Sequence, residues 1–377
     1  MNLRNIRAIV RKEIYHLLRD FRSLYLAFAL PLLLILLFGY ALSLDVDHIE
    51  TVVVDQDRTD LSRDFIRRLG ASPYFRIVAR LPDSRAVTRE LDFGRTTLAV
   101  IIPPGWTADL RSDRETALQI LLDGSDPNFA GISRAYISGF VESHNRKLLV
   151  DYLDRQGMEK IRLPVDGRIR VWFNEDLESR NFIIPGIIAI IIMIVGAMLT
   201  SLVIAREYEN GTMETIRSLP VRAGEFLIGK AIPYFAITLI DVLVSILMGQ
   251  VLFGVVMKSS FLLMILASSL YILVALTLGL LISSVTKSQM IANQAAVLIT
   301  YLPSLLLSNF VFPIINMPKV LQAVTYFVPA TYYIDILAGI YLRRLGFADL
   351  WPDMLILTVM FAVLAALNCA VLKREGL

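Results

Sequence analysis

The sequence predicts a polytopic α-helical membrane protein with six transmembrane helices and an inserted α/β extracytoplasmic domain. Hydrophobic residues make up 56% of the 377 residues and charged residues only 19%, whereas soluble domains are about half apolar and about a quarter charged. The charges are also segregated, because they are frequent in residues 45–180 and rare in the long apolar runs on either side. The net charge of +3 therefore says little about partners.

The chain begins with a basic amphipathic segment. In residues 2–22 apolar side chains recur every three or four positions, and arginines and a lysine fill much of the rest. A helix with this pattern suits the headgroup region of an anionic leaflet. We therefore expect residues 1–23 to form a cytoplasmic interfacial helix in contact with membrane lipid, with a surface helix packed on a partner as the alternative.

Apolar runs long enough to cross a bilayer, which takes roughly 20 helical residues, occur six times. They are residues 24–44, 182–205, 231–257, 261–284, 290–312 and 351–372. The first run exceeds the core of a signal peptide, which is about 7–15 residues, so we expect a retained span. The external segment 313–350 is apolar but broken by Pro313, Pro318 and Pro329. Because backbone groups freed by proline cannot face lipid unsatisfied, we expect short re-entrant or interfacial helices there.

Residues 45–180 have the composition of a soluble α/β domain tethered to the membrane at both ends. Short runs rich in β-branched residues predict strands. These runs are TVVVD (51–55), FRIVA (75–79), TLAVII (97–102) and ALQILL (117–122). Amphipathic stretches between them predict helices, followed by a long helix over 132–156, and the chain returns through 168–174.

Lys and Arg near the ends of the spans predict orientation, since cytoplasmic loops are enriched in both. One side carries the N-terminal cluster, Arg206, Arg217, Arg222, Lys230, Lys287, Lys373 and Arg374; the short loops of the other carry Lys258, Lys319, Arg343 and Arg344. The first side is predicted to be cytoplasmic. The chain is then a multi-pass protein of a bacterial cytoplasmic (inner) membrane, with both termini inside and residues 45–180 outside.

The polar segment 206–230 between the second and third spans is longer than a turn requires. Asn210-Gly211 predicts a turn, Thr212 is a candidate N-cap, and Glu214 falls where the helix dipole favours an anion. Pro220 ends the helix after about two turns. A helix this short is marginal alone in water, so we expect the bilayer surface or another protein to support it.

The same segment contains a near-match to a nucleotide-binding loop. Gly224 is followed after four residues by Gly229 and Lys230, but the next residue is Ala231, where a P-loop has Ser or Thr to hold magnesium. No strand precedes it either. We therefore expect no ATP to bind directly to this chain.

The stretch REYENGTMETIRSLPVRAGEFLIGK (206–230) resembles the cytoplasmic coupling segment of the type-2 ATP-binding-cassette exporter permeases. The matching positions are Arg206, Glu207, Glu209, Gly211, Thr212, Glu214, Pro220, Glu225, Gly229 and Lys230. The RKE of residues 11–13, the Asn181-Phe182 entry to the second span and the large domain between the first two spans are also similar. The resemblance covers essentially the whole chain.

This resemblance implies a six-span permease subunit, not itself an enzyme, that pairs with a second permease as a homodimer or with a paralogue. It implies cytosolic ATPase subunits that hold Mg-ATP and dock on this segment. ATPase coupling would then involve Arg206, Glu207, Glu209, Gly211, Thr212, Glu214 and Pro220. The branch with a large external domain resembles exporters of drugs and other amphipathic molecules, often with a periplasmic adaptor protein.

Polar residues inside the predicted spans are candidates for a translocation path. Asp241 lies well inside the third span, where a charge is costly and usually faces the bundle interior or a cavity. It is either a substrate or proton contact, or a neutral or paired residue bonding a neighbouring helix. Asn293 and Gln294, near the start of the fifth span, either bond between helices or line a path.

Two other functions remain open at this level. One is a proton-coupled secondary transporter that uses Asp241; the other is a membrane-anchored receptor or scaffold whose external domain does the work. No metal site is predicted, because the three histidines are scattered and the single cysteine, Cys369, lies in an apolar run. No nucleic-acid partner is predicted either.

Overall fold

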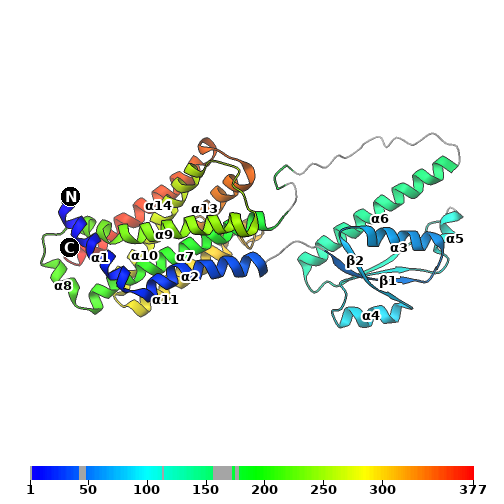
Figure 1. Cartoon of the computed structure of the whole chain (residues 1–377), viewed down its shortest axis with the longest axis horizontal. Helices are drawn as coiled ribbons and strands as arrows, with labels where there is room; N and C mark the ends of the chain where they lie inside the picture. The colour runs from blue at the N-terminus through cyan, green and yellow to red at the C-terminus, as the bar shows by residue number, and fades with distance from the viewer. Residues whose placement is uncertain (1, 42–47, 113, 156–171, 175–177) are drawn as a thin grey trace. The chain divides into compact units, whose positions relative to one another are not determined.

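The computed structural model describes residues 2–41, 48–112, 114–155, 172–174 and 178–377 (Figure 1). The chain divides into two compact units, one formed by Met1–Ser43 with Val171–Leu377 and the other by Leu44–Arg170. Each unit is described by itself.

The first unit is helical. Its elements are α1 (Leu3–Arg19), α2 (Phe21–Ala41), α7 (Arg180–Glu209), α8 (Thr212–Arg217), α9 (Ala223–Phe253), α10 (Phe261–Thr286), α11 (Gln289–Leu306), a 3-10 turn (Ile314–Asn316), α12 (Lys319–Thr325), α13 (Pro329–Ala338), a π-helical turn (Gly339–Arg343) and α14 (Phe347–Arg374). The break between α1 and α2 falls at Asp20, where the basic segment ends and the first apolar run begins.

Helix α7 is the centre of this unit and packs against α2, α9, α10 and α11. The most apolar 18-residue stretch of α7 is 89% buried, because these neighbouring helices pack around it. The approach to α10 is close: a Cβ on Gly279 would lie 2.9 Å from the Cα of Ala197. At the same level Thr200 Oγ1 donates to the carbonyl of Leu276 at 3.1 Å.

Four helices in the described residues, α7, α9, α10 and α14, are long and apolar enough to cross a membrane. A fifth candidate is the pair of α12 and residues 329–343, if these two helices, bent by 78°, count as one span. The first and fifth predicted runs are also helical: α2 is apolar over Phe28–Tyr40, and α11 opens with polar side chains. The protein is therefore a helical membrane protein with four to five candidate spans by length and composition.

The proline-broken stretch contains short helices, as its sequence predicts. Pro329 occupies the first turn of α13, where its missing N–H costs nothing, and the preceding Val328 is extended (φ −91°, ψ 110°). The bend between α12 and α13 therefore follows from Pro329. The position of these helices relative to a bilayer stays a prediction.

The second unit contains a small four-stranded sheet of order β2-β1-β3-β4. The strands are β1 (Ile49–Asp55), β2 (Phe75–Leu81), β3 (Leu98–Ile102) and β4 (Gln119–Leu122), and the helices are α3 (Asp60–Ala71), α4 (Ser84–Asp92), α5 (Trp106–Arg111) and α6 (Pro127–Arg155). β1 pairs in parallel with β2 and β3, and β4 runs antiparallel to β3.

Both faces of this sheet are covered. Phe65 of α3 and Ile137 of α6 pack on one face, and Val87 of α4 packs on the other. β3 is buried along its whole length, which explains why its sequence is continuously apolar rather than alternating. The strand predictions are confirmed, while the predicted return through 168–174 lies mostly outside the described residues.

Candidate functional site

The turn between α7 and α8 is made by Gly211. Its φ of +72° lies in the left-handed region, which glycine adopts without the Cβ clash of other residues. Gly211 is therefore the N-cap, and Thr212 is the first residue of α8, so the prediction that Thr212 is the N-cap was wrong by one position. Thr212 Oγ1 instead reaches back to the side chain of Glu207, to which it donates a hydrogen bond.

Helix α8 is short and anchored on one side. Met213 is buried, whereas Glu214 and Thr215 are exposed. The chain leaves the helix through Pro220, whose carbonyl accepts a hydrogen bond from Asn5 Nδ2 of α1 at 3.1 Å. The predicted helix thus exists, its packing on the unit accounts for its stability, and it presents the Glu214 carboxylate outward.

Beside α8 lies a buried ion cluster, formed by Lys12, Glu13, Glu207 and Lys230. The Lys230 ammonium is 1% exposed and donates to Glu13 Oε1 and to Glu207 Oε1, both at 2.5 Å. Lys12 donates to the same Glu207 oxygen at 2.6 Å. Removing water from a charge is costly unless the charge is paired and hydrogen-bonded. With two ammonium groups and two carboxylates the cluster is neutral, and it ties α1, α7 and α9 together.

The buried ion cluster gives the Gly-Lys of the near-match a structural role. A Cβ on Gly229 would lie 2.8 Å from the Cβ of Ile9, so only glycine lets α1 approach α9 this closely. Lys230 is occupied by its two carboxylate partners. The spacing that resembles a phosphate loop thus serves helix packing and charge pairing.

A second group of contacts centres on Glu375, just past the end of α14. Its carboxylate accepts from Lys287 Nζ at 2.6 Å, Arg217 Nη2 at 2.8 Å and the Tyr208 hydroxyl at 2.9 Å. The hydrogen bond from Lys287 is the largest cause that holds the pKa of Glu375 below its usual range, despite partial burial. The hydrogen bond from Tyr208 and the positive charges of Lys287 and Arg217 act in the same direction.

Two of the predicted coupling residues make further links. Arg206 pairs with Asp20 at 3.0 Å, between α7 and the junction of α1 with α2. The carboxylate of Glu209 accepts from the backbone N–H and the side-chain amide of Gln289, at 2.7 and 2.5 Å, and so satisfies the first turn of α11. All seven predicted coupling residues lie in or beside this network at one end of the first unit (Figure 1).

No coupling role was predicted for Lys12, Glu13, Tyr208, Lys287 or Glu375, although residues 11–13 were part of the resemblance. For Glu13 a signal was present. It falls in the series Ile6, Val10, Glu13, Leu17, which follows the apolar stripe of α1 at helical spacing. A carboxylate on an apolar stripe requires a buried partner, and Lys230 is that partner.

The predicted path residues lie on two helices, α9 and α11. Asp241 is 1% exposed on α9, and neither carboxylate oxygen has a hydrogen-bond partner among the described residues. Thr238 Oγ1, one turn earlier on the same helix, likewise lacks one in the described part of the chain. Asn293 is half-buried and Gln294 is exposed, both on α11. The alternative in which Asp241 bonds a neighbouring helix therefore finds no partner atom within the described ranges.

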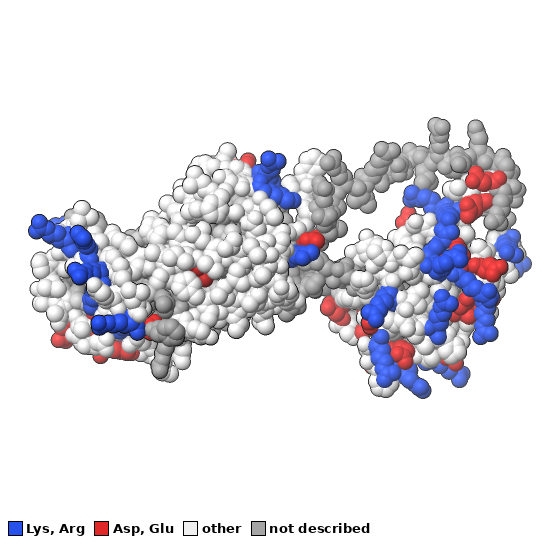
Figure 2. Space-filling model, viewed as in Figure 1, with Lys and Arg blue, Asp and Glu red and all other residues white. Residues whose placement is uncertain are grey.

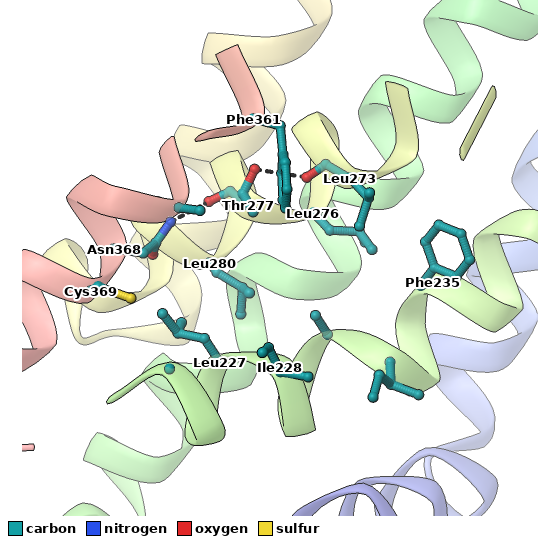
Figure 3. A pocket seen from close by; sticks show the side chains of 14 residues that line it. Leu227, Ile228, Phe235, Leu273, Leu276, Thr277, Leu280, Phe361, Asn368 and Cys369 are labelled. Atoms are coloured by element: carbon teal, nitrogen blue, oxygen red, sulfur yellow. Dashed lines mark hydrogen bonds between the residues drawn. The ribbon is translucent and has the colours of Figure 1, made fainter. Parts of the chain in front are cut away.

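A cavity of about 410 Å³ opens between α9, α10 and α14 (Figure 3). Its lining is apolar and comprises Gly224, Leu227, Ile228, Ala231, Ile232, Phe235, Leu273, Leu276, Thr277, Leu280, Phe361, Ala365, Asn368 and Cys369. The amide of Asn368 donates to the carbonyl of Thr277, another lining residue, at 2.8 Å. The cavity therefore offers hydrocarbon surface.

The chain is similar to known membrane permeases along nearly its whole length. Residues 21–370 match a family described as "ABC-2 family transporter protein". "Probable multidrug ABC transporter permease YbhS" of Escherichia coli K12 is 35% identical over 368 residues, which cover 97% of this chain and 94% of YbhS. "Probable multidrug ABC transporter permease YbhR" of the same strain is 27% identical, covering 97% and 98%. "Inner membrane transport permease YhhJ" is 26% identical, covering 81% and 80%.

Proposed function

Because the chain belongs to the ABC-2 family of transporter proteins, we propose that it is the permease subunit of an ATP-driven exporter. Its cargo would be amphipathic or hydrophobic molecules that leave across the cytoplasmic membrane. A separate cytosolic ATPase subunit would bind and hydrolyse Mg-ATP. The observation that carries this proposal is α8, a six-residue helix held at the end of the bundle with the Glu214 carboxylate exposed.

The proposed topology has six spans, with α2 and α11 added to the four helices that are long and apolar enough. In Figure 2 the first unit carries its visible charges mainly toward its ends, with a largely uncharged surface between them. The ion pairs of Lys12 with Glu207, and of Arg217 and Lys287 with Glu375, support a common side for the predicted cytoplasmic cations. Both termini would be cytoplasmic, and residues 45–180 would lie outside and receive an adaptor protein.

The network around α8 supports a mechanical role. The buried ion cluster joins α7 and α9, which flank α8 in the sequence, to α1. A displacement of α8 by an ATPase would therefore also displace α1, α7 and α9, which the ion pairs link. Packed helices can transmit such displacements over distance. Pairing with a second permease, identical or paralogous, would place two such sets of helices on two ATPase subunits.

The apolar cavity supports the proposed class of cargo. It is lined by three candidate spans, and its wall carries aromatic and aliphatic side chains of the kind that line sites for drug-sized ligands. A molecule entering from the inner leaflet would meet hydrocarbon surface there. The relatives named as multidrug permeases are consistent with this class of cargo.

A second candidate function, a proton-coupled carrier without an ATPase, is favoured by one observation. Asp241 is a buried carboxylate without a partner among the described residues, and such groups within membrane spans mark substrate or proton contacts.

Co-purification in mild detergent from the native host separates the two functions. The wild-type chain should bring down an ATPase, and Glu214→Lys should lose both the ATPase and transport because it reverses the exposed charge of α8. Gly211→Pro should do the same, since proline cannot adopt a φ of +72°. Lys319→Glu in α12 is the matched charge-reversal control and should retain both. A clean permease without ATPase, with transport intact in all variants, would favour the carrier.

A further inference from the structure

The carboxylate of Glu375 accepts hydrogen bonds from side chains of three segments. Tyr208 belongs to the end of α7, Arg217 ends α8, and Lys287 lies between α10 and α11. Arg217 and Tyr208 both bond Oε2, whereas Lys287 bonds Oε1, so the two oxygens divide between the α8 side and the α10–α11 side.

The aromatic ring of Tyr208 reinforces this arrangement. Lys287 Nζ lies 5.1 Å and the Arg217 guanidinium 5.6 Å from the ring centroid. Both cations therefore interact with one ring and one carboxylate, which keeps two like charges close at low cost. The side chains of Glu375 and Arg217 are 24% and 31% exposed, so solvent only partly screens the pair.

The backbone conformation of Lys287, the residue that ends α10, fixes where its side chain begins. Its φ of +56° lies in the left-handed region, which side chains other than glycine rarely adopt, and its N–H donates to the Ser283 carbonyl at 3.2 Å to end α10. The direction of the Lys287 side chain follows from this turn. It sends the ammonium toward Glu375, across the end of the bundle.

We propose that Glu375 is a positioning residue that makes α8 and the α10–α11 turn move as one body, so that a displacement of α8 reaches α10 and α11. This inference rests on the proposed function, which it deepens by naming the route from the ATPase contact into the spans. Without the carboxylate, Arg217 and Lys287 would be left as two neighbouring cations that repel each other. Helix α8 would then follow the turn less closely, through the remaining contacts of Tyr208 with Arg217 and Lys287.

Spin labels test the link directly. Thr215 of α8 and Met290 at the start of α11 are both exposed and can be replaced by cysteine in a Cys369→Ser background, which removes the single native thiol. In the full-length permease in nanodiscs, pulsed electron paramagnetic resonance should give a narrow distribution of the distance between the two labels when Glu375 is present. Glu375→Gln should broaden it, because the neutral amide cannot hold both cations. Arg374→Gln, an exposed neighbour, is the matched control and should leave it narrow.

The same variants in the complex with the ATPase test the consequence. Glu375→Gln should retain the ATPase and hydrolyse ATP, but transport per ATP should fall about fivefold or more, the lower range of coupling between sites. A narrow distribution in Glu375→Gln would overturn the inference. So would a lower melting temperature with transport per ATP unchanged, which would make the role structural only. Failure of the wild-type chain to bind any ATPase would instead overturn the proposed function, and the distance measurement on the permease alone would still decide the link.

Discussion

Helix α9 buries charge in opposite ways at two of its levels. Near its start, Lys230 meets two carboxylates and each charge has a partner. About three turns further along, Asp241 is equally buried and has no partner among the described residues. The ion pairs of Lys230 link α9 to α1 and α7, whereas Asp241 forms no such link among the described residues.

The difference indicates different roles for two buried ionisable side chains of this helix, Lys230 and Asp241. Removing one member of a paired and hydrogen-bonded cluster strongly lowers the stability of the fold, because its partners are left charged and shielded from water. An unpaired buried carboxylate costs stability, and in a membrane span such a group marks a functional contact. The start of α9 thus holds helices together, and we propose that its middle meets a proton or a substrate.

The largest expected effect comes from removing the shared cation. Among the described residues, Lys230→Met leaves Glu13 with the Tyr234 hydroxyl, at 3.4 Å, as the remaining donor. We expect a loss of about 3–5 kcal/mol in the free energy of unfolding, the usual cost of breaking a buried pair. A loss of this size should appear as a large fall in the melting temperature, measured by size-exclusion chromatography of heated, detergent-solubilised protein. Adding Glu13→Gln restores neutrality, because the Lys12–Glu207 pair remains, and should recover part of the loss. Equal instability of this double variant would contradict this account.

Asp241 should behave in the opposite way. Asp241→Leu removes a buried polar group without a described partner, so thermal stability should stay the same or rise by about 1 kcal/mol or more. Transport should nevertheless fall about tenfold, roughly the effect of one lost contact worth 1.4 kcal/mol. Efflux from intact cells and melting temperature measured on the same variant separate the two outcomes. A melting temperature as low as that of Lys230→Met would mean that Asp241 is a structural residue.

Glu375 is the intermediate case, paired but partly exposed, and its pH dependence should be the smallest effect. Its pKa is lowered by the hydrogen bonds from Lys287 and Tyr208 and by the positive charges of Lys287 and Arg217. A lowered folded-state pKa means that its stabilisation is present above the ordinary glutamate value and is lost as pH falls through the folded value. We therefore expect the wild-type melting temperature to lie slightly above that of Glu375→Gln at both pH 7 and pH 5.5, with the difference shrinking only in stronger acid. A difference that disappears already between pH 7 and pH 5.5 would show that Glu375 is not held ionised by these cations.

Much of the secondary structure was readable from local pattern. TVVVD, FRIVA, TLAVII and ALQILL all contribute strands, and the apolar runs all contain helices. The central position of α7 was not readable. Its residues are apolar on every face, and composition does not distinguish a side chain that faces lipid from one that faces protein, because both surroundings are apolar.

The candidate site divides in the same way. The sequence predicted a turn at Asn210-Gly211 and a short helix ended near Pro220, because glycine and proline act on the backbone locally. It placed the cap on Thr212, since hydroxyl side chains are common caps, but Gly211 takes that position and leaves the Thr212 hydroxyl to bond Glu207.

By itself the sequence determined the succession of elements, the segregation of charge and the family to which the chain belongs. The tertiary structure alone decided which charges meet. Lys230 pairs with Glu13 across 217 residues of sequence, and Arg217 pairs with Glu375 across 158. The spacing of charges along a chain carries no distance in space, so the partners appear only when packing of α1, α7, α9 and α14 brings them within hydrogen-bonding reach. The same packing left Asp241 without a described partner, which no pattern of residues revealed.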